Sequence, residues 1–164
     1  MTNLLQFDKG NPKIPRHKRP SSTDDEFETP TRLYVKLCQL YNIKPIIDVA
    51  ATKDNRKCLD YFTKEDNALE QNWINDFWCN HPHTLHAQFI EKSCKEAKKH
   101  NLNGIMIIPA NCQRTRYWHE YIESETECFI ENHPIRGSIT FLKNGKPTKE
   151  SARNAYICIV FRKK

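Results

Sequence analysis

The stretch that decides the fold class is residues 85–109, LHAQFIEKSCKEAKKHNLNGIMIIP. From Leu85 to His100 the apolar side chains recur at helical spacing, on a face that carries Ala87, Ile90, Cys94 and Ala97. The run GIMII at 104–108 is short and wholly apolar, so it predicts a buried strand that Pro109 ends. A helix that leads into a fully apolar strand is typical of a parallel sheet covered by helices.

The same alternation extends outward in both directions. IIDV at 46–49 and FWC at 77–79 predict two more short buried strands, and Thr29-Pro30 predicts an N-cap and first turn of a helix that Lys44-Pro45 ends. Residues 50–64 show no period and are expected to be a loop. Beyond the central stretch we expect a helix at 114–123 and a strand at 128–130. Strands at 138–142 and 155–161, joined through an Asn144-Gly145 turn signal, are expected to form an antiparallel C-terminal pair.

These elements together predict an α/β fold with a mostly parallel sheet. About 28 residues separate Ala51 from Asn80, which leaves little room for two intervening strands, so the sheet is expected to be reduced. Residues 1–23 are rich in proline and basic residues and predict a disordered basic tail, with a phosphate-contacting arm as the alternative.

Composition narrows the classes of function. The chain has 164 residues, which is one ordinary domain, and only four glycines, which excludes nucleotide sites of the G-x-G-x-x-G or P-loop kind. Its net charge of +6 hints at an anionic partner. The seven cysteines are odd in number and scattered, and neither a secretory signal nor an apolar run of membrane-spanning length is present. We therefore expect an intracellular protein with reduced thiols and no membrane partner.

Candidate site residues follow the predicted strands, because ligands of open α/β sheets bind beyond the carboxyl ends of the strands. Asp48 ends the first strand, and Ala50 after it lets a ligand approach; the alternative is a turn aspartate. The second strand is followed by a segment that suits a planar base or forms a polar turn, namely Asn80, His81, Pro82 and His83. A zinc site is a further alternative, with the ligands Cys79, His81, His83 and His86.

The third strand leads into a segment in which arginine and aromatic residues interleave. Arg114 and Arg116 beside Tyr117 and Trp118 suit contacts to nucleic-acid phosphates and bases, while the alternative is a helix start with a core tryptophan. Arg136, before the predicted strand at 138–142, is a third candidate for phosphate contact.

Several segments, in order, resemble the phage-type DNA N-6-adenine methyltransferases. They include an acidic-aromatic-x-Thr-Pro motif, a Leu-Asp-x-Ala-Ala-like strand end, a Tyr-aromatic-Thr segment, an Asp-x-Ala-Leu-x-x-x-Trp stretch and a Trp-x-Asn-x-Pro site. Here these are Asp25–Pro30, Ile47–Ala51, Tyr61–Thr63, Asp66–Trp73 and Trp78–Pro82. Asn55, Ile107–Ala110 and Trp118-His119 extend the resemblance, which covers about residues 25–161.

The resemblance implies a Rossmann-like fold over residues 24–164, forming one catalytic domain. It implies an S-adenosylmethionine-dependent enzyme that methylates the exocyclic amine of an adenine flipped out of double-stranded DNA, of phage or mobile-element origin. Position by position, it implies that Thr29 and Pro30 lie by the methionine end of the cofactor. Asp48 and Ala50 would form the cofactor loop, and Asp66 would contact the cofactor's adenine with Phe62 packed nearby. Asn80 and Pro82 would hold the target amine, with position 83 stacking on the base.

The tetrapeptide departs from the family pattern. The family has Asn-Pro-Pro-Tyr, whereas this chain has histidines at positions 81 and 83. Two alternatives therefore stand beside the adenine methyltransferase. One is a catalytically impaired module that binds S-adenosylmethionine or nucleic acid, and the other is an amino-methyltransferase that acts on cytosine or RNA. Target specificity is expected from the 110–155 region, from a homodimer or from a partner subunit.

Overall fold

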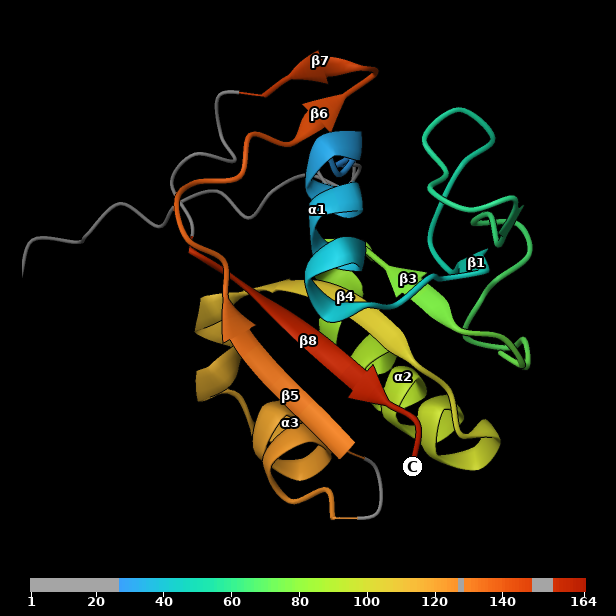
Figure 1. Cartoon of the computed structure of the whole chain (residues 1–164), viewed down its shortest axis with the longest axis vertical. Helices are drawn as coiled ribbons and strands as arrows, with labels where there is room; N and C mark the ends of the chain where they lie inside the picture. Colours follow the sequence, from blue (N-terminus) through green and yellow to red (C-terminus); the bar gives the residue numbers. More distant parts are fainter. Residues whose placement is uncertain (1–26, 127–128, 149–154) are drawn as a thin grey trace, which may run out of the picture.

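The computed structural model describes residues 27–126, 129–148 and 155–164. Within these residues six strands form one sheet in the order β2-β1-β3-β4-β8-β5, and a separate pair, β6-β7, forms a hairpin (Figure 1). The strands are β1 (Ile47–Asp48), β2 (Asp60–Tyr61), β3 (Phe77–Cys79), β4 (Gly104–Pro109), β5 (Phe129–Pro134), β6 (Leu142–Lys143), β7 (Lys146–Pro147) and β8 (Tyr156–Arg162).

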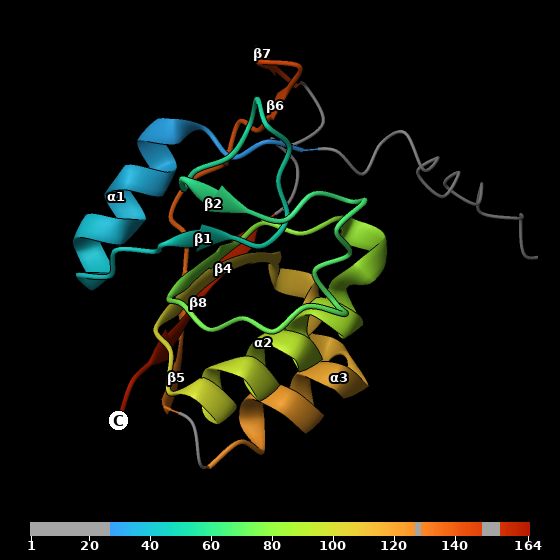
Figure 2. The same cartoon turned by 90° about the vertical axis from the view of Figure 1, so that its right-hand side faces the viewer.

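The expected alternation of helices and strands holds only in part, because β1, β2 and β3 follow one another with no helical segment between them. The helical segments are α1 (Thr31–Tyr41), the 3-10 turn η2 (His83–Leu85), α2 (His86–His100), η3 (Ala110–Arg114), α3 (Arg116–Trp118) and the π-helical turn η4 (His119–Glu123). In Figure 2, α1 covers one face of the sheet while α2 and α3 cover the other. No helix of the described ranges combines the length and apolar character that crossing a membrane requires.

The sheet is mostly parallel, which confirms the expected fold class. Strands β2, β1, β3 and β4 pair in parallel, β8 is antiparallel to β4, and β5 is antiparallel to β8. Since two reversals restore the direction, β5 runs parallel to β4, and β8 is the one reversed strand of this sheet. The sheet is also reduced, because β2 alone stands between β1 and β3 along the chain.

Two expectations about strands were wrong. The segment 155–161 does not pair with 138–142; as β8 it lies between β4 and β5, where both neighbours satisfy its backbone and its side chains are almost all buried. The antiparallel pair near the C-terminus is instead the β6-β7 hairpin around Asn144-Gly145. The segment 50–64 is a loop for most of its length, but β2 lies in it, paired through only two residues.

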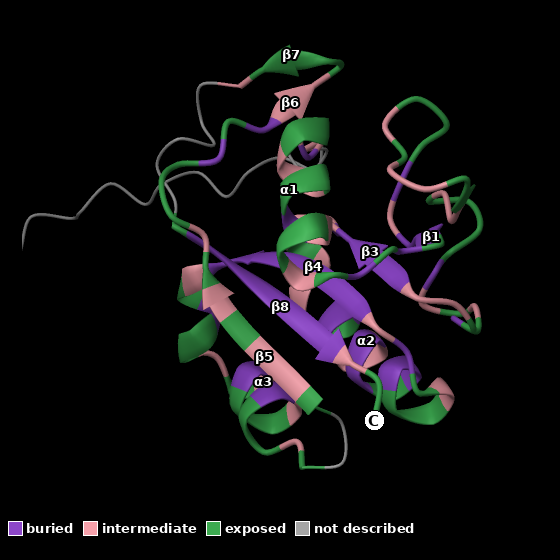
Figure 3. Cartoon of the chain, in the orientation of Figure 1, coloured by how far each residue is buried: buried purple, intermediate pink, exposed green. Residues whose placement is uncertain are grey.

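Alternation along the strands builds a core on each face of the sheet. Met106 and Ile108 of β4 pack in the cluster under α2 and α3, whereas Ile105 and Ile107 pack in the cluster under α1. Figure 3 shows β3 and β4 buried throughout and β8 buried except at its last residue. Gly104 begins β4 where the ring of Phe77 lies so close that a Cβ would approach its atoms to 2.3 Å.

The predicted helix start at Thr29 was wrong in one respect. Pro30 is the residue at the N-cap of α1, with ψ of 133°, and its carbonyl accepts hydrogen bonds from Leu33 and Tyr34. The Thr29 hydroxyl makes no capping bond; it is buried instead. The tail predicted for residues 1–23 and the Cys128 end of the predicted strand lie outside the described residues.

Candidate functional site at the carboxyl edge of the sheet

The carboxyl ends of β1, β3 and β4 lie side by side, because these strands are parallel and adjacent. Asp48 ends β1, Asn80 follows β3, and Pro109 ends β4. The strand register therefore gathers residues that are separated by more than sixty positions in the sequence, as expected from the strand-end argument.

Asp48 organises the loop that follows β1. Its side chain is 3% exposed, its Oδ1 accepts the N–H of Ala50 at 3.3 Å, and its Oδ2 accepts the N–H of Lys57 at 2.9 Å. Burial raises the pKa of this carboxyl to about 6, although both backbone N–H groups and the Lys57 charge oppose the rise. Both oxygens are thus engaged by the loop itself, which agrees with the turn alternative, while contact of Asp48 with a cofactor stays a prediction.

Phe62 and Asp66 lie further along the same loop. The backbone of Phe62 continues the β1-β2 pairing, with its N–H on the carbonyl of Asp48 at 2.9 Å, and its ring packs against the core. Asp66 is exposed, and its Oδ2 accepts both the N–H and the hydroxyl of Thr63 at 2.8 Å. These hydrogen bonds lower the pKa of Asp66. Their contacts with a cofactor stay predictions.

Asn80 is oriented by a segment 53 residues earlier. Its Nδ2 donates to the carbonyl of Phe27 at 2.8 Å. A carbonyl only accepts, so the amide nitrogen must face Phe27 and the Oδ1 must point the opposite way. Next to Phe27, the Oγ1 of Thr29 is buried and has no hydrogen-bond partner among the described residues. The structure therefore brings the motif that ends in Thr29-Pro30 to Asn80 through its Phe27.

His81 points into the protein. Its side chain is 3% exposed, and its ring stacks on Phe89 at 5.1 Å between centroids and 13° between planes. Its Nδ1 lies 3.5 Å from the sulfur of Cys79, and its Nε2 lies 2.7 Å from Nδ1 of His86. Burial, followed by the nearby His86 and His83, lowers the pKa of His81 well below its ordinary value. The ring is therefore neutral and anchors the tetrapeptide to α2.

Pro82 and His83 lie nearer the surface. Pro82 precedes η2, and its carbonyl accepts the N–H of Leu85 at 3.0 Å. The ring of His83 lies among other rings, with centroids 5.3 Å from Phe27, 5.3 Å from His86 and 6.4 Å from Tyr156. An aromatic position is thus kept at the end of the tetrapeptide.

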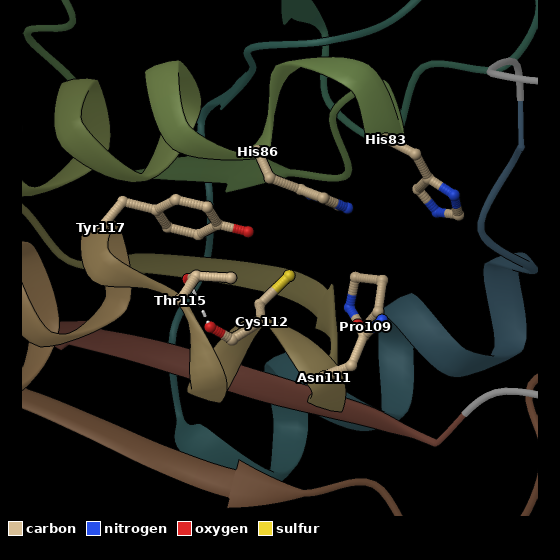
Figure 4. A pocket seen from close by; sticks show the side chains of 7 residues that line it. All are labelled: His83, His86, Pro109, Asn111, Cys112, Thr115 and Tyr117. Carbon is tan, nitrogen blue, oxygen red and sulfur yellow. Dashed lines mark hydrogen bonds between the residues drawn. The ribbon is translucent and has the colours of Figure 1, made fainter. Parts of the chain in front are cut away.

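A cavity of about 220 Å³ opens between η2-α2 and the segment after β4, and Figure 4 shows the side chains around it. Its lining combines two imidazoles, an amide, two hydroxyls, a thiol and a proline: His83, His86, Pro109, Asn111, Cys112, Thr115 and Tyr117. This volume is below the roughly 300–1,000 Å³ of pockets for drug-sized ligands, so it suits a part of a ligand, such as one base. Of the tetrapeptide, His83 is the member that lines it.

Sequence reasoning overlooked Thr115 and considered His86 only as a metal ligand. The available signal for Thr115 was its place between Cys112 and Tyr117 in the segment that follows β4. For His86 the signal was its position three residues after His83, which places both on one side of a helical turn. No group of three or more histidine, cysteine or acidic side chains positioned for a metal ion occurs in the described part of the chain.

The three candidate arginines are all exposed near this edge. Arg114 ends η3, and Arg116 begins α3 with its Nε 3.4 Å from Oε2 of Glu120. Arg136 follows the carboxyl end of β5. Exposure leaves all three accessible to a large partner, and phosphate contact stays a prediction. Trp118 is buried in the core, so its alternative as a core residue is confirmed.

Comparison with known proteins gives the family. Residues 16–164 match the model of the DNA N-6-adenine-methyltransferase (Dam) family. A DNA N-6-adenine-methyltransferase of Haemophilus phage HP1 is 26% identical over 120 residues, which cover 68% of this chain and 69% of that protein. One of Escherichia phage T1 is 26% identical over 140 residues, which cover 84% of this chain and 56% of that protein. The family match spans nearly the whole chain, and the chain therefore belongs to the DNA N-6-adenine-methyltransferase (Dam) family.

Proposed function

We propose that this protein transfers a methyl group from S-adenosylmethionine to the exocyclic amine of adenine in double-stranded DNA. One observation carries the proposal. The amide of Asn80 stands at the carboxyl end of β3 with its nitrogen on the carbonyl of Phe27 at 2.8 Å, so its Oδ1 is presented as a fixed acceptor. An acceptor held in this way can take a hydrogen bond from the target amine and orient the nitrogen lone pair for methyl transfer.

The residues at this edge fit S-adenosylmethionine in a Rossmann-like arrangement. The buried Oγ1 of Thr29 has no hydrogen-bond partner among the described residues, so it is available to a ligand oxygen or nitrogen. When bound, the cofactor supplies an electrophilic methyl group on a sulfonium. We assign its methionine end to Thr29 and Pro30, its ribose side to the loop that Asp48 and Ala50 organise, and its adenine to Asp66 and Phe62.

Access to the amine requires the adenine to leave the duplex, since the reacting atom is shielded inside it. The 220 Å³ cavity begins at His83, three residues after Asn80, and accepts an object about the size of a base. In this proposal His83 stacks on the extruded ring and Pro82 shapes the turn beneath it. Asn80 and the backbone carbonyl after it accept the two N–H groups. The reaction needs no nucleophilic side chain, so positioning carries most of the rate.

The buried His81 supports this arrangement in place of the family's first proline. A proline restricts the backbone by its ring, whereas His81 restricts it through its stack on Phe89 and its hydrogen bond to His86. The exposed arginines at 114, 116 and 136 would contact phosphates around the site.

A second candidate is a module that binds S-adenosylmethionine or DNA without transferring the methyl group. The observation that favours it is the position of His83, whose ring lies among Phe27, His86 and Tyr156 and would need to keep a face available for the base. Substituting His83→Tyr restores the family's residue. Transfer that appears only in this variant would support the binding module.

The deciding experiment is a methyl-transfer assay read by mass spectrometry. The full chain is incubated with isotopically labelled S-adenosylmethionine and, in separate reactions, with unmethylated DNA or with RNA, and the digested nucleosides are weighed. Labelled N-6-methyladenine is the expected product. Label on cytosine would change the substrate, label on RNA alone would exclude DNA as the substrate, and an absence of label on every nucleic acid would refute the enzymatic proposal.

A further inference from the structure

The β6-β7 hairpin projects away from the main sheet (Figure 1). Its sequence from 141 to 148 is FLKNGKPT, which contains two lysines and no acidic residue. The turn is tight, with φ of 50° at Asn144 and 71° at Gly145, and residues 144–147 are exposed. A two-residue turn of this kind pairs the half-buried Lys143 with the exposed Lys146 across the hairpin, next to its tip.

The base of the hairpin is firmly docked. Phe141 is 1% exposed, and its ring lies 4.9 Å from that of Tyr156 and 6.1 Å from that of Phe27, measured between centroids. Leu142 and Glu28 exchange two backbone hydrogen bonds, of 2.8 and 2.9 Å. Thr148 closes the hairpin on the carbonyl of Phe141 through both its N–H and its hydroxyl. The lysines are thus carried on a supported element.

Glu28 lies where the hairpin meets the loop after β1. Its Oε1 accepts the N–H of Gly145 at 3.4 Å. Burial lowers the pKa of the Lys57 ammonium, and the charges of Asp48 and then Glu28 oppose that lowering. Lys57 in turn donates its backbone N–H to Asp48. The Glu28 carboxylate therefore contacts the turn of the hairpin, and its charge acts on Lys57 of the loop after β1.

The hairpin pairs with the residue that follows Phe27, whose carbonyl orients Asn80. Leu142 pairs with Glu28, and the carbonyl of the preceding residue, Phe27, accepts the Asn80 amide. Two lysines on an element docked beside the site suit a polyanion that extends past a single base.

We propose that the β6-β7 hairpin contacts the DNA duplex beside the target base, with Lys143 and Lys146 on its phosphates, and that Glu28 is the positioning residue that holds the hairpin over the site. This inference rests on the proposed function for its choice of partner. The phosphate contacts give affinity, while the docked base sets where the duplex lies relative to Asn80.

The test is the affinity of the full chain for a short fluorescently labelled DNA duplex, measured by anisotropy over a series of salt concentrations. The double variant K143Q/K146Q is compared with K99Q/K164Q, which removes the same charge from exposed positions at the opposite edge of the sheet. Each lost phosphate contact lowers the slope of log K against log salt by about 0.9. We expect the hairpin variant to lose about 1.8 in slope and at least roughly tenfold in affinity at 0.1 M salt.

The role of Glu28 is tested by combining its substitution with those of the two hairpin lysines. E28A alone is expected to weaken DNA binding several-fold, and E28Q, which keeps an oxygen for the N–H of Gly145, to remain close to wild type. Added to K143Q/K146Q, E28A should weaken binding by less than about twofold further, because a residue that acts through the hairpin loses its effect when the lysines are gone. Full additivity would refute the role of Glu28.

Three outcomes separate this inference from the proposed function. If K143Q/K146Q and K99Q/K164Q bind alike, the hairpin is not a DNA contact, whether or not the wild type methylates adenine. If the wild type does not bind DNA, the inference also fails, and binding of S-adenosylmethionine measured by calorimetry shows whether the cofactor part stands. If the hairpin variant alone is impaired while the wild type transfers no methyl group, the inference holds and the enzymatic proposal fails.

Discussion

Replacing Asn80 with aspartate tests the orientation of the tetrapeptide most directly. Aspartate keeps an acceptor oxygen for the target amine, but its ionised carboxylate cannot donate to the carbonyl of Phe27, which Asn80 contacts at 2.8 Å. Leaving that carbonyl unpaired beside a charge costs about 1–3 kcal/mol. If this free energy is added to the activation barrier of methyl transfer, kcat drops roughly 5- to 150-fold at pH 8. Asn80→Ala also removes the acceptor, so its kcat should fall roughly 100- to 1,000-fold.

The direction in which the kcat of Asn80→Asp changes with pH distinguishes a loss of side-chain orientation from a general disruption of the fold. Protonation of the introduced aspartate restores a donor toward Phe27, so the ratio of Asn80→Asp to wild-type kcat should rise as the pH falls from 8 toward 5. The assay is initial-rate methyl transfer to DNA at saturating substrates, with thermal unfolding and cofactor binding as controls for folding. Wild-type kcat for Asn80→Asp at pH 8, or a ratio that does not change with pH, would refute the reasoning.

Three further predictions concern the residues that support the site. Gly104→Ala should lower the free energy of unfolding by about 1–3 kcal/mol, measured in urea, because its methyl group would collide with the Phe77 ring; unchanged stability would show that the ring moves freely. Burial raises the pKa of Asp48 to about 6, above its unfolded value near 3.8. The folded state therefore binds the extra proton, and wild-type stability should fall relative to Asp48→Asn by up to about 3 kcal/mol as pH rises from 4 to 6; parallel pH profiles would contradict this. His81→Pro should destabilise by about 1–3 kcal/mol through loss of its buried contacts, whereas His83→Tyr should change stability by less than about 1 kcal/mol; equal effects in chemical unfolding would show that His81 is no anchor.

Local patterns were sufficient for the central elements of the fold. The apolar run at 104–108 and the helical spacing at 85–100 form β4 and α2. Such elements can be predicted locally, because the order of apolar and polar residues in each segment already shows which of its faces is buried. The predictions that were wrong concern strands whose pairing partners are distant in the sequence. Nothing local to 155–161 shows that it inserts between β4 and β5, since strand pairing depends on two segments that lie 22 or more residues away.

The features of the candidate site also separate into those that the sequence predicts and those that depend on tertiary contacts. The sequence by itself determined the family, the strand ends that hold Asp48 and Asn80, and the departure of positions 81 and 83, because these are matters of residue type and order along the chain. The tertiary structure alone decided that His81 turns inward onto Phe89, that Phe27 orients the Asn80 amide, and that the β6-β7 hairpin docks on Glu28. Each of these depends on contacts between segments far apart in sequence, and such contacts form only once the sheet has brought its carboxyl edge together.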